Sequence, residues 1–236
     1  MNKAELQHIR EAERQYHEEY FENVALFEEG TWLEQPTPII LELLKYFDLR
    51  SPIQVLDLGC GVGRNSIPLA SMLKPAGGHI HCVDLLDVAI DKLNEYSQEH
   101  QLEEVITTQQ SDISEFPYEK EAYHYILAVS CLEHAKSEAS LKRILASFVE
   151  GTISGGINYI DMNTNIQEYN INNGHQRKPL FEVNLSSEEA IHLLRTHYEG
   201  WEELHMDTTP IAIEINRDGI PVCLQSDCLA FAVRKP

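Results

Sequence analysis

The sequence lacks several features that would assign it to a common class of protein. No apolar run in the 236 residues is long enough to span a membrane, and no basic and then apolar leader opens the chain. The five cysteines have no CxxC spacing, and the eleven histidines form no HxxxH or HExxH pair. These absences predict a cytoplasmic protein with reduced thiols, no membrane partner and no metal site.

Basic residues are also scarce, with 18 Lys and Arg against 38 Asp and Glu, for a formal net charge of -20. A surface this acidic repels phosphate backbones, so nucleic acid is not an expected partner. The charge also confers solubility, and it says little about a small molecule held in a closed pocket. At 43% hydrophobic residues, the chain can bury one sizeable core, which predicts a single domain.

Strand-like and helical segments alternate through the middle of the chain. Strands are predicted at 54–58, 79–84, 105–110, 123–130 and 156–162, and helices between them at 64–73, 88–100 and 138–149. Near-continuous apolar strands that alternate with helices indicate a parallel sheet covered on both faces. The predicted fold is a Rossmann-like three-layer α/β/α sandwich, with a mostly parallel seven-stranded sheet and an antiparallel C-terminal hairpin.

The two ends of the chain follow other patterns. Residues 2–29 favour a helix that Gly30 ends, and a second helix is predicted at 39–47. Residues 163–179 resemble a loop, residues 186–198 a helix opened by Ser186 or Ser187, and three strand-like runs follow, with Asn216–Gly219 as a hairpin turn. Within one domain we expect three regions: an N-terminal helical cap (1–48), a cofactor-binding core (53–163), and a substrate-side insert with the last strands (164–236).

Three glycines, Gly59, Gly61 and Gly63, follow the first predicted strand. A loop at the carboxyl edge of such a sheet binds ligands, and glycines let the backbone approach a nucleotide cofactor closely. The dinucleotide fingerprint GxGxxG is not completed, because Arg64 or Ser66 stands where the third glycine belongs. A carboxylate just before the loop would also repel a pyrophosphate, which disfavours a nicotinamide cofactor.

The pattern Asp57-x-Gly59-x-Gly61-x-Gly63 resembles motif I of the class I S-adenosylmethionine-dependent methyltransferases. The strand ends "HCVDLL", "SDIS" and "YHYILAVSCLEHA" follow in the order of that family, and the resemblance covers residues 39–163. The last third loosely resembles the tellurite-resistance methyltransferases, through "YEGWEEL" and the hairpin. Only Arg217 stands where that subgroup has a polar His-Arg segment.

The resemblance implies roles for the residues at this edge. Asp57 would favour the amino acid end of S-adenosylmethionine, directly or through water, and Asp84 would bind the two ribose hydroxyls. Asp112 would bind the adenine amino group, and the Ile113 amide would donate to a ring nitrogen. The full predicted cofactor set is Asp57, Gly59, Cys60, Gly61, Gly63, Asn65, Asp84, Leu85, Asp112, Ile113, Val129 and Ser130.

Residues for the acceptor side are predicted from the same resemblance. His134 could act as a general base, since imidazole titrates near neutrality, or it could fix the loop after the strand. Tyr20 and Trp32, from the N-terminal cap, and Asn163 and Arg177, from the insert, would form the substrate pocket. Plain packing would also explain the aromatic residues.

These features predict a cytoplasmic S-adenosylmethionine-dependent methyltransferase that acts on a small molecule, as a monomer or a homodimer. Two alternatives stay open. A non-catalytic module that binds the same cofactor would keep every motif, and an NAD-dependent oxidoreductase would share the sheet.

Overall fold

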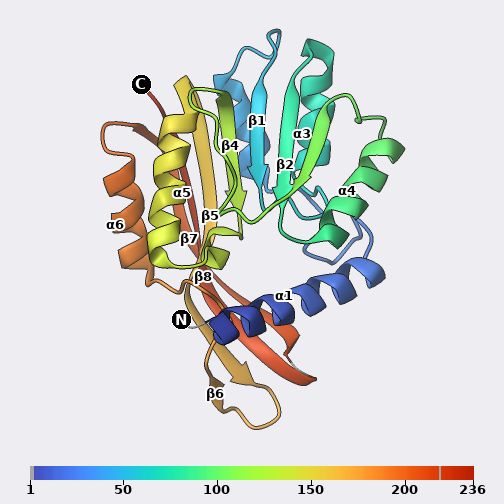
Figure 1. Ribbon diagram of the computed structural model, residues 1–236, viewed down its shortest axis with the longest axis vertical. Coiled ribbons are helices and arrows are strands. Elements are labelled where there is room, and N and C mark those ends of the chain that lie inside the picture. Colours follow the sequence, from blue (N-terminus) through green and yellow to red (C-terminus); the bar gives the residue numbers. More distant parts are fainter. Residues whose placement is uncertain (1–2, 218) are drawn as a thin grey trace.

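The computed structural model describes residues 3–217 and 219–236, which form one eight-stranded sheet between two layers of helices (Figure 1). The strands are β1 (Gln54–Leu58), β2 (His79–Asp84), β3 (Ile106–Gln110), β4 (Tyr123–Val129), β5 (Thr152–Asn170), β6 (Gln176–Arg177), β7 (Glu202–Arg217) and β8 (Ile220–Arg234). The helices are α1 (Lys3–Asn23), α2 (Pro38–Glu42), α3 (Ser66–Leu73), α4 (Asp87–Glu99), α5 (Glu138–Gly151) and α6 (Ser187–His197), with the short 3₁₀ helices η1 (Leu43–Tyr46), η2 (Lys74–Ala76) and η3 (Leu132–His134).

The sheet order is β3-β2-β1-β4-β5-β8-β7, with β6 paired to β5 beside this path. Strands β1 to β5 are parallel, and β8 pairs antiparallel with both β5 and β7. Consecutive side chains of the parallel strands enter two cores. Val55 and Leu127 pack under α2, α3 and α4, whereas Leu56 and Ile126 pack under α5 and α6. The predicted three-layer sandwich is confirmed.

Strand β5 is much longer than predicted. Its pairing with β4 ends at Val129 and Asp161, but its pairing with β8 continues to Asn170 opposite Val222. The prediction of a loop was therefore wrong for residues 163–170. These residues form a strand because they pair with β8, and their polar sequence does not indicate that pairing. We call residues 163–170, 209–217 and 220–228 the hairpin extension. The three predicted C-terminal runs form two long strands; Asp218, in the predicted turn between them, lies outside the described residues.

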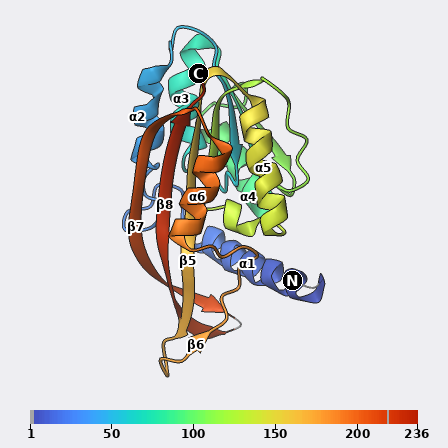
Figure 2. The same cartoon turned by 90° about the vertical axis from the view of Figure 1, so that its left-hand side faces the viewer.

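Helix α1 crosses beneath the carboxyl ends of the parallel strands, beside the hairpin extension (Figures 1 and 2). It ends at Asn23 and not at residue 29, and Phe27 already adopts a φ of 67°. Its Tyr16 packs on a small third core in the extension, formed by Ile166, Ile215, Val222 and Leu224. This contact places α1 over the edge where ligands bind in such sheets.

The helix predicted at 186–198 is confirmed, and Ser186 is its N-cap. The Ser186 hydroxyl accepts a hydrogen bond from the Glu189 amide, while the Glu189 carboxylate accepts one from the Ser186 amide. This capping box satisfies two groups that the helix itself cannot pair.

We expect the substitution Leu127→Ala to lower the free energy of unfolding by about 3 kcal/mol, because it leaves a cavity in the centre of the sheet. Leu127 is fully buried, whereas Leu49, at 37% exposure, offers a matched control. Urea denaturation would measure both variants. Similar losses for Leu127→Ala and Leu49→Ala would contradict this account of the core.

Candidate functional site

The glycine loop between β1 and α3 is held in a conformation that needs glycine. Gly59, Gly61 and Gly63 have φ values of 65°, 52° and 95°. A Cβ at Gly59 would lie 2.3 Å from Cβ of Cys131, and one at Gly63 would lie 2.4 Å from Cδ1 of Leu93. At Gly61, by contrast, no described atom beyond the glycine and its two chain neighbours lies within 4 Å of the Cβ position. The loop is therefore packed on its inner side and leaves space for a ligand at Gly61.

Asp84 ends β2 directly beside this loop. Its Oδ2 accepts a hydrogen bond from the Gly61 amide at 2.9 Å, and its Oδ1 accepts one from the Leu86 amide at 2.9 Å. Burial raises the pKa of the Asp84 carboxyl, and the two amides oppose that rise. The carboxylate is thus fixed in position at the open side of the loop.

Asp57 lies deeper, at the end of β1. It is 1% exposed and accepts a hydrogen bond from the Ser66 hydroxyl, at the start of α3. Burial raises the pKa of Asp57 to about 7, even though the hydrogen bond from Ser66 opposes the rise. Asp57 therefore fixes the first turn of α3 relative to β1. Asn65 has a similar positioning contact, because its Oδ1 accepts a hydrogen bond from the Thr37 amide at 2.9 Å.

Asp112 follows β3 and faces α1. Its Oδ1 accepts a hydrogen bond from the Ser114 amide at 2.8 Å, and its Oδ2 lies 2.7 Å from Nη2 of Arg10. Lys136 contributes a second cation at 3.4 Å. Burial alone would raise the pKa of Asp112, but the Ser114 amide and Arg10 lower it overall. The residue predicted to bind adenine is ionised and already paired with α1.

The remaining predicted cofactor residues surround this edge. Ile113 and Val129 are buried, whereas Leu85 is 36% exposed. Ser130 is exposed, with a φ of 48°, and its amide donates a hydrogen bond to the Asp161 carbonyl. A non-glycine residue with positive φ at the end of a strand is a strained position of the kind that clusters at functional sites.

Sequence analysis missed the charged face of α1. Arg10, Arg14 and His17 lie on one side of the helix, since they are four and three residues apart. Arg10 pairs with Asp112, Arg14 pairs with Asp87 at 2.7 Å, and the charge of His17 acts on Asp84. The spacing of these three residues is visible in the sequence, but it does not show which carboxylates they contact.

His134, the predicted general base, lies between two acidic residues. Its Nδ1 is 3.0 Å from Oε2 of Glu182, and its Nε2 is 4.0 Å from Oε2 of Glu13. Phe181 stacks on the imidazole, with 5.1 Å between the ring centroids. Burial would lower the pKa of His134, but the hydrogen bond with Glu182 and the charge of Glu13 raise it to about 9. At neutral pH the imidazole is therefore protonated, so it can donate hydrogen bonds but cannot act as a general base.

The predicted substrate residues fall into three places. Tyr20 and Trp32 stack on each other at 5.0 Å, and the Arg64 guanidinium lies 5.7 Å from the Trp32 ring. The Asn163 amide group donates a hydrogen bond to Oε1 of Glu133 at 2.6 Å. Arg177 lies in β6, at the far end of the hairpin extension (Figure 1). The structure thus brings the aromatic pair to the glycine loop and Asn163 to η3, and places Arg177 away from both.

A second group that sequence analysis left unassigned joins α1 to the hairpin extension. Arg217, only 2% exposed, lies 2.6 Å from Oε1 of Glu13 and 3.4 Å from Oε1 of Glu168. Its guanidinium also lies 5.8 Å from the Phe181 ring. No local sequence signal could have found these contacts, because the partners come from α1, β5 and β7.

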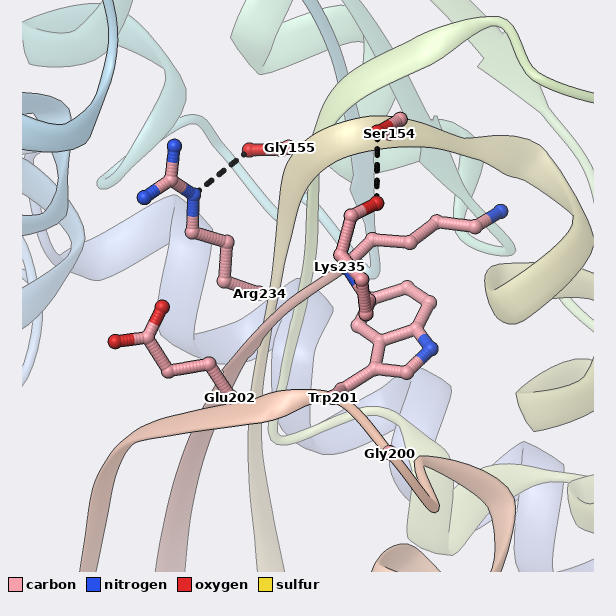
Figure 3. A pocket seen from close by; sticks show the side chains of 8 residues that line it. Ser154, Gly155, Gly200, Trp201, Glu202, Arg234 and Lys235 are labelled. Atoms are coloured by element: carbon pink, nitrogen blue, oxygen red, sulfur yellow. Dashed lines mark hydrogen bonds between the residues drawn. The ribbon is translucent and has the colours of Figure 1, made fainter.

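A pocket of about 460 Å³ opens at the opposite, amino edge of the sheet (Figure 3). It lies where β5 starts and β8 ends, and is lined by Ser154, Gly155, Gly200, Trp201, Glu202, Arg234, Lys235 and Pro236. Arg234 donates a hydrogen bond to the Gly155 carbonyl, and Ser154 donates one to a carbonyl oxygen of Pro236. The pocket is therefore separate from the glycine loop and its carboxylates.

Within residues 3–217 and 219–236, no helix combines the length and hydropathy needed to cross a membrane. In the same part of the chain, no three His, Cys, Asp or Glu side chains are grouped as metal ligands.

We expect Gly59→Ala to destabilise the protein by roughly 2 kcal/mol more than Gly77→Ala, because only the first substitution forces a Cβ into Cys131. Both glycines have positive φ, at 65° and 70°, so the strain of that conformation is common to the two variants. Chemical denaturation gives the comparison. Equal losses would mean that the loop tolerates a side chain at position 59.

The stability of the protein should fall as the pH rises from 6.5 to about 9. The folded protein holds the His134 proton more tightly than the unfolded chain, whose imidazole has its ordinary pKa of 6.5. That contribution is complete below pH 6.5 and is lost as the pH passes the folded-state value. Urea denaturation across this range should show a shallower loss in His134→Gln, and an unchanged slope would refute the assignment.

Comparison with known proteins agrees with this geometry. Residues 55–156 match the family described as "Methyltransferase domain". TehB from Haemophilus influenzae is 22% identical, with a TM-score of 0.63 over 93% of this chain and 67% of that chain. No curated protein matches the sequence significantly.

Two further solved structures share the fold. The N-methyltransferase NodS from Bradyrhizobium japonicum, in complex with S-adenosylhomocysteine, is 17% identical, with a TM-score of 0.59 over 95% of this chain and 99% of that chain. The [4+2]-cyclase SpnF is 15% identical, with a TM-score of 0.60 over 88% of this chain and 83% of that chain. The family match over residues 55–156 and these similar structures confirm the resemblance to class I methyltransferases and support S-adenosylmethionine as the cofactor.

Proposed function

We propose that the protein is an enzyme that transfers a methyl group from S-adenosylmethionine to a small molecule. The observation that carries this proposal is the Asp84 carboxylate, which the amides of Gly61 and Leu86 hold beside the glycine loop. Two acceptor oxygens in that position suit a ribose diol.

The residues present fit this cofactor. The space over Gly61 admits a ligand, and Asp84 and Asp112 offer acceptors for hydroxyl and amino groups. Buried Asp57 places a carboxyl group behind the loop, and its ionised form would favour an ammonium and disfavour a pyrophosphate. The glycine spacing and these carboxylates together argue against the NAD-dependent alternative.

When bound, the cofactor supplies an electrophilic methyl group on a sulfonium. The chain has to align the acceptor with that methyl group, exclude water and, for some acceptors, hold a proton. Helix α1 covers the edge and would exclude water. Tyr20 and Trp32 form an aromatic wall next to the loop, where cation–π attraction would favour a positive charge.

A small acceptor is supported by this covering of the edge. Ion pairs from α1 to Asp112 and Asp87 hold the helix across the carboxyl edge of the sheet. Side chains of the helix therefore line this edge, which suits a compact substrate better than a polymer. The net charge of -20 disfavours nucleic acid. We place the enzyme in the cytoplasm, where free thiols such as these five cysteines stay reduced, and we propose that the chain forms a single domain.

A second candidate is a non-catalytic module that binds the same cofactor. The pKa of about 9 for His134 favours it, because the imidazole is not a free base at neutral pH. The similarity in fold to a [4+2]-cyclase also indicates that the fold alone does not fix a reaction.

The substitution Asp84→Asn should weaken the binding of S-adenosylhomocysteine at least tenfold, since it removes a charged acceptor that is fixed by two amides. Isothermal titration measures this affinity, and Asp91→Asn, on the exposed side of α4, is the matched control. Unchanged affinity in Asp84→Asn, or binding of NAD in place of S-adenosylhomocysteine, would overturn the proposal. Binding without turnover over a broad acceptor panel would favour the module.

A further inference from the structure

Asp112, the residue predicted to bind the adenine amino group, already faces a cation of α1. Its side chain is only 8% exposed, and its Oδ1 accepts a hydrogen bond from the Ser114 amide at 2.8 Å. Nη2 of Arg10 lies 2.7 Å from Oδ2, yet Oδ2 is buried and accepts no aligned hydrogen bond from the described residues. The guanidinium therefore balances the charge of Oδ2 but leaves this atom without a directed donor, which is costly for a buried carboxylate oxygen.

Arg10 also covers this carboxylate. It belongs to α1, which crosses the carboxyl edge of the sheet (Figure 1). The second nearby cation, Lys136, lies 3.4 Å from Oδ2 and also contacts Glu115. An adenine amino group can donate to the buried Oδ2 only after a group packed against it moves, and Arg10 is the closer of the two cations.

Arg10 has a second carboxylate beside it. Its Nε donates a hydrogen bond to Oε1 of Glu182 at 3.4 Å, and the Glu182 side chain is 1% exposed. One guanidinium thus bridges the loop after β3 and the segment after β6. The Arg10 side chain is 25% exposed, whereas Ile9 and Ala12 of the same helix are buried. The guanidinium can therefore turn from Asp112 toward Glu182 while the helix keeps its packing.

We infer that Arg10 competes with the cofactor for Asp112: the adenine amino group displaces the guanidinium from Oδ2, and Glu182 retains it. This inference rests on the proposed function and on the predicted role of Asp112. The exchange gives Oδ2 the directed donor that Arg10 does not supply. Lys136 stays near the carboxylate and continues to balance its charge.

The exchange affects the affinity for the cofactor. Breaking the contact between Arg10 and Asp112 opposes binding, and a closer hydrogen bond with Glu182 returns part of that free energy. An ion pair with one partly exposed partner contributes little, so the net opposition corresponds to about a fivefold loss of affinity. Arg14, on the same face of α1, pairs with Asp87 and Glu18, neither of which is a predicted cofactor residue. Arg14 therefore offers a matched control.

The first test compares two ligands on the native protein by isothermal titration. One is S-adenosylhomocysteine, and the other is its analogue in which a carbonyl oxygen replaces the adenine amino group. We expect S-adenosylhomocysteine to bind at least about tenfold more tightly, because the carbonyl oxygen cannot donate to Asp112 or displace Arg10. Equal affinities would mean that the amino group does not reach Asp112, and they would overturn the inference.

The second test removes the competitor. Arg10→Gln should bind S-adenosylhomocysteine about fivefold more tightly than the native protein, whereas Arg14→Gln should change the affinity by less than about twofold. A purely structural role of Arg10 in holding α1 predicts weaker binding in Arg10→Gln. Unchanged or weaker binding in Arg10→Gln would overturn the inference. An equal gain in Arg14→Gln would also overturn it, because a general loosening of α1 would then explain both results.

A double-mutant cycle assigns the effect to Asp112. In an Asp112→Asn background, Arg10→Gln should give no further gain in affinity, since the carboxylate for which Arg10 competes is gone. A gain that persists there would overturn the assignment. The comparison of the two ligands on the native protein stands even if a variant does not fold, and failure of S-adenosylhomocysteine to bind the native protein would refute the proposed function instead.

Discussion

The ion pairs that hold α1 across the carboxyl edge constrain the rest of the site. Arg10 and Arg14 tie the helix to Asp112 and Asp87, and Glu13 ties it to Arg217 of β7. A helix fixed at these points brings side chains from the first turns of the chain next to strand ends more than 70 residues away. Helix α1 thereby supplies positive charge to Asp112, through Arg10, and to Asp84, through His17, which are two of the three carboxylates predicted to bind the cofactor.

Burial gives these charges their chemical character. Asp57 and Asp84 lose water, which raises their pKa values, whereas Asp112 and Glu13 have close cations that lower theirs. For the His134 imidazole, burial would lower the pKa, but Glu182 and Glu13 outweigh that effect and raise it. The same edge thus holds carboxyl groups with raised pKa values, Asp57 and Asp84, and an imidazole that stays protonated at neutral pH.

Local patterns predicted the parallel core well. The ranges predicted for β1 and β2 match the observed strands, because apolar strands covered on both faces are continuous in sequence. The end of β5 was mistaken for a loop, since residues 163–170 are polar and depend on β8 for their hydrogen bonds. Asp84 could be assigned from the order of the motifs, but its two amide donors belong to the folded loop.

The sequence by itself determined the sheet, the glycine loop and the carboxylates at the strand ends, because strand periodicity and backbone sterics act over a few residues. Only the tertiary structure decided what those carboxylates contact. The pairing of Glu13 with Arg217, and the pKa of His134, arise from side chains that meet across three separate elements. Electrostatic energies depend on distance and burial in space, and spacing along the chain encodes neither.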